Sequence, residues 1–163
     1  MKLVVSTHGH WDHVGDNAAV SSATGAAIAV HPLDREALEH PSPLWAPFDI
    51  PPCVPAVELA EGGEVRFGEI RLRVLHTPGH TPGSVCLQSV DGGLLFSGDT
   101  LFAGGWGRID LPGGSSDEMV DSLVRLSELE GRTAVLPGHG PATTIARERP
   151  WLEMVRSSGS LPA

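Results

Sequence analysis

Residues 8–13 carry the densest set of metal-ligand side chains in the chain. They contain three imidazoles and one carboxylate, in the order His8, Gly9, His10, Trp11, Asp12, His13. Side chains two positions apart on an extended segment point the same way, so His8 and His10 can share one ligand site. Asp12 and His13 follow directly and can face a second point beside the first. Imidazole nitrogen and carboxylate oxygen suit zinc, iron or manganese. The absence of thiolate argues against a closed structural site of the cysteine type.

Three further ligand-type residues each follow an apolar, strand-like segment. They are His80, between two Pro-Gly pairs; Asp99, after Ser97-Gly98; and His139, after Pro137-Gly138. Taken singly, each is more typical of an ordinary loop residue than of a ligand, and residues 8–13 alone could form a histidine-rich surface loop. Chance clustering of this kind is rare, however, and together the residues form two sets of metal ligands.

The elements that must position these residues form a strand-rich α/β pattern. Apolar or alternating runs predict strands over residues 2–6, 26–30, 65–67, 70–75, 84–90, 94–97 and 133–136. Helical patterns with capping residues and glycine stops predict helices over residues 12–24, 32–40, 115–130 and 144–156. The candidate ligands follow strands, as functional groups do in layered α/β folds.

The segment of residues 41–55 is the least regular part. Its six prolines forbid regular structure, and it carries Trp45 and Phe48. The two rings either lie over the site as part of a lid or pin the loop to the core, and we favour the second interpretation.

Composition limits the class of protein. The length of 163 residues predicts a single domain with its own core. A net charge of −9 argues against a nucleic-acid partner, because phosphate binding requires a basic face. No apolar run reaches the roughly 18 residues of a membrane span. The two cysteines do not make a disulfide framework, so we expect a cytoplasmic location.

The ordered motifs resemble the metallo-β-lactamase superfamily, and more narrowly its short glyoxalase-II-like (hydroxyacylglutathione hydrolase-like) metal-dependent hydrolases. The residues that carry the resemblance are, in chain order, His8, His10, Asp12, His13, His80, Asp99 and His139. The resemblance extends from Ser6 to about Thr144. It implies an α/β fold of the αββα sandwich type, as one domain over residues 1–163, with the site at one edge between two sheets.

The same resemblance implies two metal ions, expected to be zinc, with iron or manganese as alternatives. The ligands implied for the first metal are His8, His10 and His80. The ligands implied for the second metal are Asp12, His13 and His139. Asp99 would bridge the two metals.

The implied activity is hydrolysis of a small-molecule thioester, of the hydroxyacylglutathione type, or of a related ester. Two metals can share a water and lower its pKa, and the resulting hydroxide attacks a carbonyl carbon. One metal then holds the developing oxyanion. Asp12 would accept a proton or orient the hydroxide, which makes it the catalytic candidate as well as a ligand.

Two other functions fit the same residues. Persulfide dioxygenases resemble this motif set and use a single iron, held by residues that match His8, His80 and Asp99. A non-catalytic metal-binding module is the third interpretation. Within the superfamily, Asp99 favours the hydrolase branch over β-lactamases, and the absence of tyrosine counts against lactonases.

The segment of residues 105–114 resembles that of short bacterial glyoxalase-II-like enzymes. Glutathione-specific members usually have Lys where Arg108 stands and Tyr where Asp110 stands, so glutathione recognition does not follow. Arg108 is the candidate for binding a substrate carboxylate. Pairing of Arg108 with Asp110, which would only brace the loop, has equal weight.

The start of the chain departs from the family pattern. Family members usually carry a longer segment before the first motif, whereas seven residues precede His8. We therefore expect an N-terminally truncated form of the fold, in which the strand at residues 2–6 leaves an apolar edge uncovered. The predicted consequence is low stability or a homo-oligomer that covers this edge.

Overall fold

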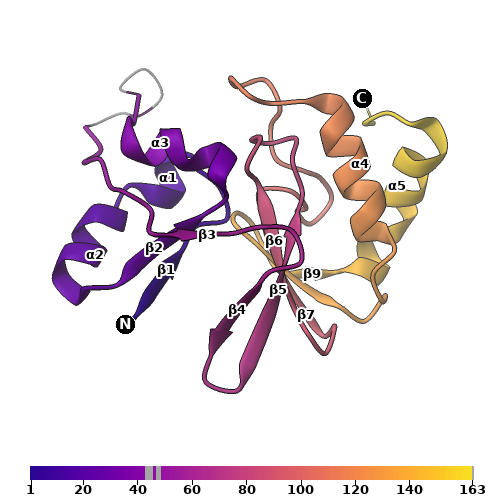
Figure 1. The fold of residues 1–163 in the computed structure, drawn as a ribbon. Coiled ribbons are helices and arrows are strands. Elements are labelled where there is room, and N and C mark those ends of the chain that lie inside the picture. Colours follow the sequence, from indigo (N-terminus) through magenta and orange to yellow (C-terminus); the bar gives the residue numbers. More distant parts are fainter. Residues whose placement is uncertain (43–45, 47–48, 163) are drawn as a thin grey trace.

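The chain folds into four layers in the order helix, sheet, sheet, helix (Figure 1). The computed structural model describes residues 1–42, 46 and 49–162. Helices on the first sheet are α1 (Trp11–Val14), α2 (Asn17–Thr24) and α3 (Arg35–Glu39), preceded by a short 3-10 helix, η1 (Pro32–Asp34). Helices on the second sheet are α4 (Ser116–Ser127) and α5 (Ile145–Ser158). The predicted αββα sandwich is confirmed.

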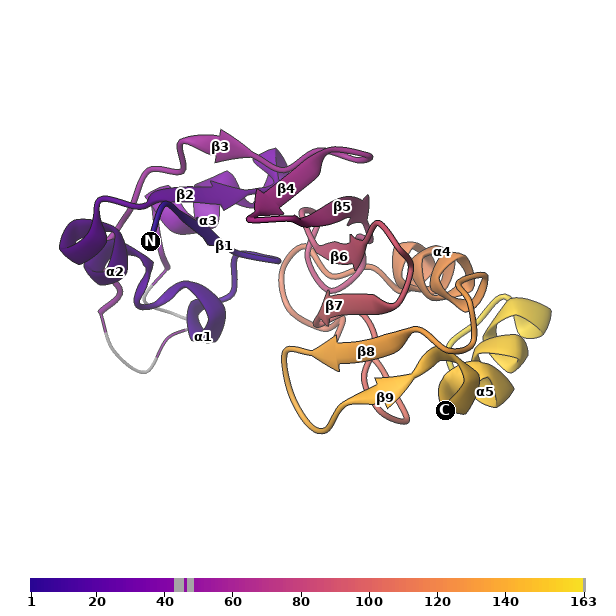
Figure 2. The same ribbon diagram turned by 90° about the horizontal axis from the view of Figure 1, so that it is seen from below.

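The two sheets differ in size and in strand direction. The first is parallel, in the order β1 (Leu3–Val5), β2 (Ala27–Val30), β3 (Val57–Glu58). The second runs in chain order through β4 (Glu64–Phe67), β5 (Ile70–His76), β6 (Val85–Ser89), β7 (Leu94–Gly98), β8 (Ala134–Pro137) and β9 (Thr143–Thr144). Figure 2 shows the second sheet between the first sheet and the pair α4 and α5.

Strand direction brings the candidate ligands to one edge. β5 and β7 are both antiparallel to β6, and β8 is parallel to β7, so β5, β7 and β8 end at the same edge of the second sheet. The end of β1 reaches this edge because the amide of Val85 donates a hydrogen bond to the carbonyl of Thr7 (2.9 Å). The loops after these four strands therefore meet.

Three apolar clusters hold the layers together. Between the first sheet and its helices lie Val14, Ile28, Val30 and Leu38. Between the sheets lie Ala29, Leu59, Val65, Leu72, Val74, Val85 and Leu87. Between the second sheet and its helices lie Leu75, Cys86, Leu95, Leu101, Met119, Val120, Leu123, Leu126, Val135, Ile145, Leu152 and Val155. Successive residues of β2 thus enter different clusters, as the two-residue period of a strand requires.

The structure differs from the predicted elements in detail. The helix predicted over residues 12–24 is split into α1 and α2 at Gly15 and Asp16. The chain restarts at Asn17, whose buried side-chain amide donates to Ser6 Oγ (2.8 Å), so α2 is fixed to the end of β1 separately from the ligand-bearing turn. The short strands β3 and β9 were not predicted, because two residues cannot carry an alternating pattern.

Two further predictions concern the aromatic residues of the proline-rich loop and the presence of membrane-spanning segments. Trp45 and Phe48 lie outside the described residues. Within the part of the chain that the structure describes, no helix combines the length and the apolar character needed to cross a membrane.

The layer between the second sheet and α4 generates a stability prediction. Leu123 is fully buried there, whereas Met154 on α5 is 57% exposed. Leu123→Ala leaves a cavity and is expected to lower the free energy of unfolding by ~2–5 kcal/mol. Met154→Ala, the control, is expected to change it by less than about 0.5 kcal/mol. Urea denaturation followed by circular dichroism measures both, and equal losses in the two variants would contradict this account of the core.

Candidate metal centre

All seven predicted ligand residues meet at the edge where the two sheets join. They form three overlapping groups, and within each group the ligand atoms lie within 4.8 Å of one another. The groups are His8, His10 and His80; His8, His13 and Asp99; and Asp12, His13 and His139. Residues separated by most of the chain are therefore brought together, and two of the groups contain the residues that the resemblance implied for the two metals.

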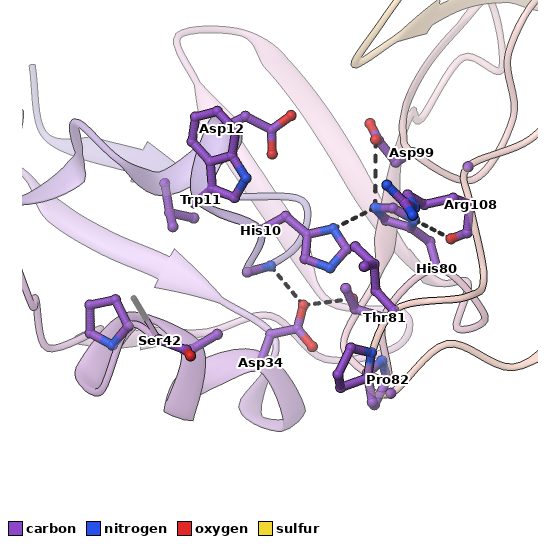
Figure 3. Close-up of a pocket in the computed structure, with 18 of the residues that line it drawn as sticks. His10, Trp11, Asp12, Asp34, Ser42, His80, Thr81, Pro82, Asp99 and Arg108 are labelled. Atoms are coloured by element: carbon purple, nitrogen blue, oxygen red, sulfur yellow. Dashed lines mark hydrogen bonds and ion pairs between the residues drawn. The ribbon is translucent and has the colours of Figure 1, made fainter. Parts of the chain in front are cut away.

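The first cluster, His8, His10 and His80, is the more enclosed. His8 is fully buried and His80 is 3% exposed. His10 Nδ1 lies 2.7 Å from His80 Nε2, and Figure 3 shows the two rings facing each other. His80 Nδ1 lies 2.7 Å from the carbonyl of Arg108, which can only accept, so Nδ1 carries the proton. His80 Nε2 consequently presents its lone pair to the cluster, as a metal ligand must.

The second cluster, Asp12, His13 and His139, is open to solvent. The side chain of His139 is 54% exposed and that of Asp12 is 33% exposed. His139 Nε2 lies 3.1 Å from His13 Nε2 and 3.2 Å from Asp12 Oδ2. Three ligand atoms thus converge from α1 and from the loop after β8.

Asp99 lies between the clusters. Its Oδ1 is 3.4 Å from His13 Nε2, and its Oδ2 is 3.5 Å from both His80 Nε2 and His139 Nε2. Gly138 lies so close that a Cβ there would collide with Asp99 Oδ1. The carboxylate faces ligands of both clusters, which is the arrangement predicted for a bridging ligand.

Two orphaned atoms test whether these residues fit a metal pair. Among the described residues, the buried side-chain atoms without a hydrogen-bond partner are His8 Nε2 and Asp99 Oδ1. Such atoms are costly and rare in folded proteins. Both belong to the convergent groups, so a bound cation would satisfy each of them. The donor set of imidazoles and carboxylates therefore fits divalent metals.

Electrostatics keep the enclosed histidines in the ligand form. Burial, followed by the charge of neighbouring histidines, lowers the pKa of His8 and His10. Burial also opposes ionisation of His13 and Asp99, but the attraction between the two groups, 3.4 Å apart, prevails, raising the pKa of His13 and lowering that of Asp99. Neutral imidazoles and an ionised carboxylate are the states that bind metal.

A cavity of about 1000 Å³ adjoins the clusters. Its apolar lining includes Trp11, Val14, Leu33 and Ala37 on one side and Pro82, Phe102, Leu111 and Pro112 on the other. This volume is sufficient for a small-molecule ligand.

Arg108 lines this cavity and pairs with Asp110. Its Nε lies 2.7 Å from Asp110 Oδ1 and its Nη2 lies 2.8 Å from Oδ2. The hydrogen bond from Arg108 lowers the pKa of Asp110 to about 2. The loop-bracing pair is thus present, and substrate binding by Arg108 stays a prediction.

Asp34 lines the same cavity and is 4% exposed, but it was not predicted as a functional residue. The available signal was its position: Asp34 ends the His31-Pro32-Leu33-Asp34 segment that follows β2, as the ligands follow their own strands.

Comparisons with known proteins agree with this geometry. The family profile of the metallo-beta-lactamase superfamily matches residues 2–139. An uncharacterized protein of Aquifex aeolicus is 41% identical, over 90% of this chain and 71% of the relative. The acyl-coenzyme A thioesterase MBLAC2 of Gallus gallus is 40% identical, over 84% of this chain and 56% of the relative. The hydroxyacylglutathione hydrolase of Rhodospirillum rubrum is 36% identical, over 83% and 47%.

A solved structure shows the same fold with metal bound. The crystal structure of TTHA1623 in a di-iron-bound form has a TM-score of 0.79 to this chain at 41% identity, covering 90% of this chain and 73% of that one.

The separation into two clusters generates a prediction about metal content. His139→Ala removes a ligand from the second cluster only, so we expect the purified variant to lose about one metal per chain while the first cluster stays loaded. Elemental analysis after desalting measures the ratio. His31→Ala is the control, because His31 stacks on His76 and belongs to none of the convergent ligand groups. Loss of both metals from His139→Ala, or of none, would contradict independent clusters.

Proposed function

Because this chain belongs to the metallo-β-lactamase superfamily, we propose that it is a dinuclear metal-dependent hydrolase acting on a thioester, of the hydroxyacylglutathione type, or on a related ester. The observation that carries the proposal is the convergence of two ligand clusters on one carboxylate, Asp99. The relatives named as a thioesterase and as a hydroxyacylglutathione hydrolase support the thioester as the substrate class.

The metals proposed are two zinc ions, with iron or manganese compatible with the same donor set. When bound, such ions lower the pKa of a water toward neutrality and polarise a carbonyl oxygen. His8, His10 and His80 would hold one ion; Asp12, His13 and His139 would hold the other. Asp99, held ionised by its neighbours, would contact both.

Asp12 is the proposed catalytic residue. It lines the cavity, its side chain is one-third exposed, and its Oδ2 lies beside His139. A carboxylate at this position can accept a proton from the attacking water, or orient that water, while it also serves as a ligand. The open side of the second cluster gives the water a path to this carboxylate.

The cavity and Arg108 are the proposed substrate contacts. The apolar walls between Trp11 and Leu111 can hold the acyl or thiol portion of the substrate. Arg108 is 60% exposed and can offer its guanidinium to a substrate carboxylate, in competition with Asp110.

Replacement of the shared carboxylate tests the proposal. Asp99→Ala removes a ligand from both clusters, so turnover of S-acylglutathione and acyl-coenzyme A should fall by more than the ~10–100-fold typical of losing an outer partner of a metal ligand. Thiol release by the zinc-loaded protein measures the rate, together with metal content. Asp91→Ala is the control, because Asp91 lies in the exposed turn between β6 and β7.

Metal content and activity of the protein purified without added metal separate the other functions. A single iron per chain with oxygen consumption on a persulfide would replace the hydrolase with a dioxygenase that uses His8, His80 and Asp99. Tight binding of two metals without turnover of any ester would favour a non-catalytic metal-binding module. Turnover that survives Asp99→Ala would contradict the proposed role of the bridge.

A further inference from the structure

Asp34 is a buried carboxylate that receives three hydrogen bonds. Its Oδ2 accepts from the amide of Gly9 (2.8 Å) and from the hydroxyl of Thr81 (2.7 Å), and its Oδ1 accepts from the amide of Gly83 (2.7 Å). Figure 3 shows it below His10 and beside Thr81. Hydrogen bonds to an ionised acceptor are roughly twice as strong as neutral ones.

The three donors belong to the two loops that carry the first cluster. Gly9 separates His8 from His10, and Thr81 directly follows His80. One loop follows β1 of the first sheet, and the other connects β5 to β6 of the second sheet. A single carboxylate on η1 therefore connects ligand-bearing loops that belong to different sheets.

Packing around this carboxylate leaves little freedom. A Cβ on Gly83 would lie 2.5 Å from Asp34 Oδ1, and a Cβ on Gly9 would lie 2.8 Å from the Cβ of Ala37. Both loops approach η1 and α3 with bare backbone, which places their amide groups against the carboxylate. Neither glycine has a backbone φ in the left-handed region. The close approach of the loops, and not an unusual backbone conformation, is therefore what requires glycine at these positions.

Asp34 acts on the site through these loops. It accepts hydrogen bonds from two backbone amides and one hydroxyl in the loops that carry the ligand residues, and it is absent from the groups of converging ligand atoms around His8. We propose that Asp34 is a positioning residue that holds the His8–His10 segment against His80, so that the first cluster is assembled before a metal binds. The proposal depends on the metal centre and is independent of the reaction catalysed there.

Asp34→Asn tests this role with minimal change of shape. The amide keeps one acceptor oxygen but turns an NH2 group toward donors, so at least one of the three hydrogen bonds is lost. In the metal-free protein, we expect faster hydrogen exchange in peptides that contain Gly9 and Gly83. Competition titration with a chelator should show zinc affinity lowered ~10–100-fold at one site, with the other site unchanged.

The matched control is Glu148→Gln. Glu148 is also buried, at 3% exposed, and accepts hydrogen bonds from the Gly104 amide and Trp151 Nε1 (2.7 Å each) and from the hydroxyl of Thr143, none of which belongs to the two loops that Asp34 joins. This variant should lose thermal stability as Asp34→Asn does, but keep both zinc affinities and the exchange rates at Gly9 and Gly83.

Two results would overturn the proposal. One is an equal loss of zinc affinity in Asp34→Asn and Glu148→Gln, which would mean that general destabilisation causes the loss. The other is unchanged exchange and affinity in Asp34→Asn. Neither readout uses thioester turnover, so failure of the proposed hydrolase activity in the unmodified protein would leave this test intact.

Discussion

The close packing of imidazole nitrogens and carboxylate oxygens at one edge of the sandwich is the constraint on which the rest of the structure depends. His10 Nδ1 and His80 Nε2 lie 2.7 Å apart, and the proton of His80 is already engaged by the carbonyl of Arg108. Burial disfavours a charged imidazolium here, as the lowered pKa of His8 and His10 reflects. Contacts such as the one between His10 Nδ1 and His80 Nε2 engage only part of this donor set, and His8 Nε2 and Asp99 Oδ1 have no hydrogen-bond partner, so the scaffold must hold the ligands together.

The scaffold does this with strand direction and with layered packing. β5, β7 and β8 deliver three loops to one edge, and the contact between Thr7 and Val85 joins the end of β1 to them. Apolar clusters on both faces of the second sheet fix those strands on each side. The strands consequently hold the ligand-bearing loops in fixed positions, as a preorganised metal centre requires.

The sequence predicted what depends on local spacing and missed what depends on distant contacts. The concentration of ligand-type side chains in residues 8–13 is visible in the sequence. The positions of His80, Asp99 and His139 after apolar runs are visible there too. Asp34 was missed because its partners Gly9 and Gly83 lie 25 and 49 positions away, and nothing near Asp34 indicates them. The break between α1 and α2 was missed for the same reason, because the contact between Asn17 and Ser6 that fixes α2 is tertiary. The pairing of Arg108 with Asp110 could be predicted because the two residues are only two positions apart, and the structure contains it.

The unequal exposure of the two clusters gives the centre a kinetic hierarchy. His8 and His80 are shielded from solvent, whereas over half of the His139 side chain is in contact with water. An ion held by the first cluster would exchange through the adjoining cavity, which His10 and His80 line, whereas an ion beside His139 would meet water and competing chelators directly. An ion in the open position would therefore exchange with the surroundings faster than an ion in the shielded position, so that mixed pairs of ions could form.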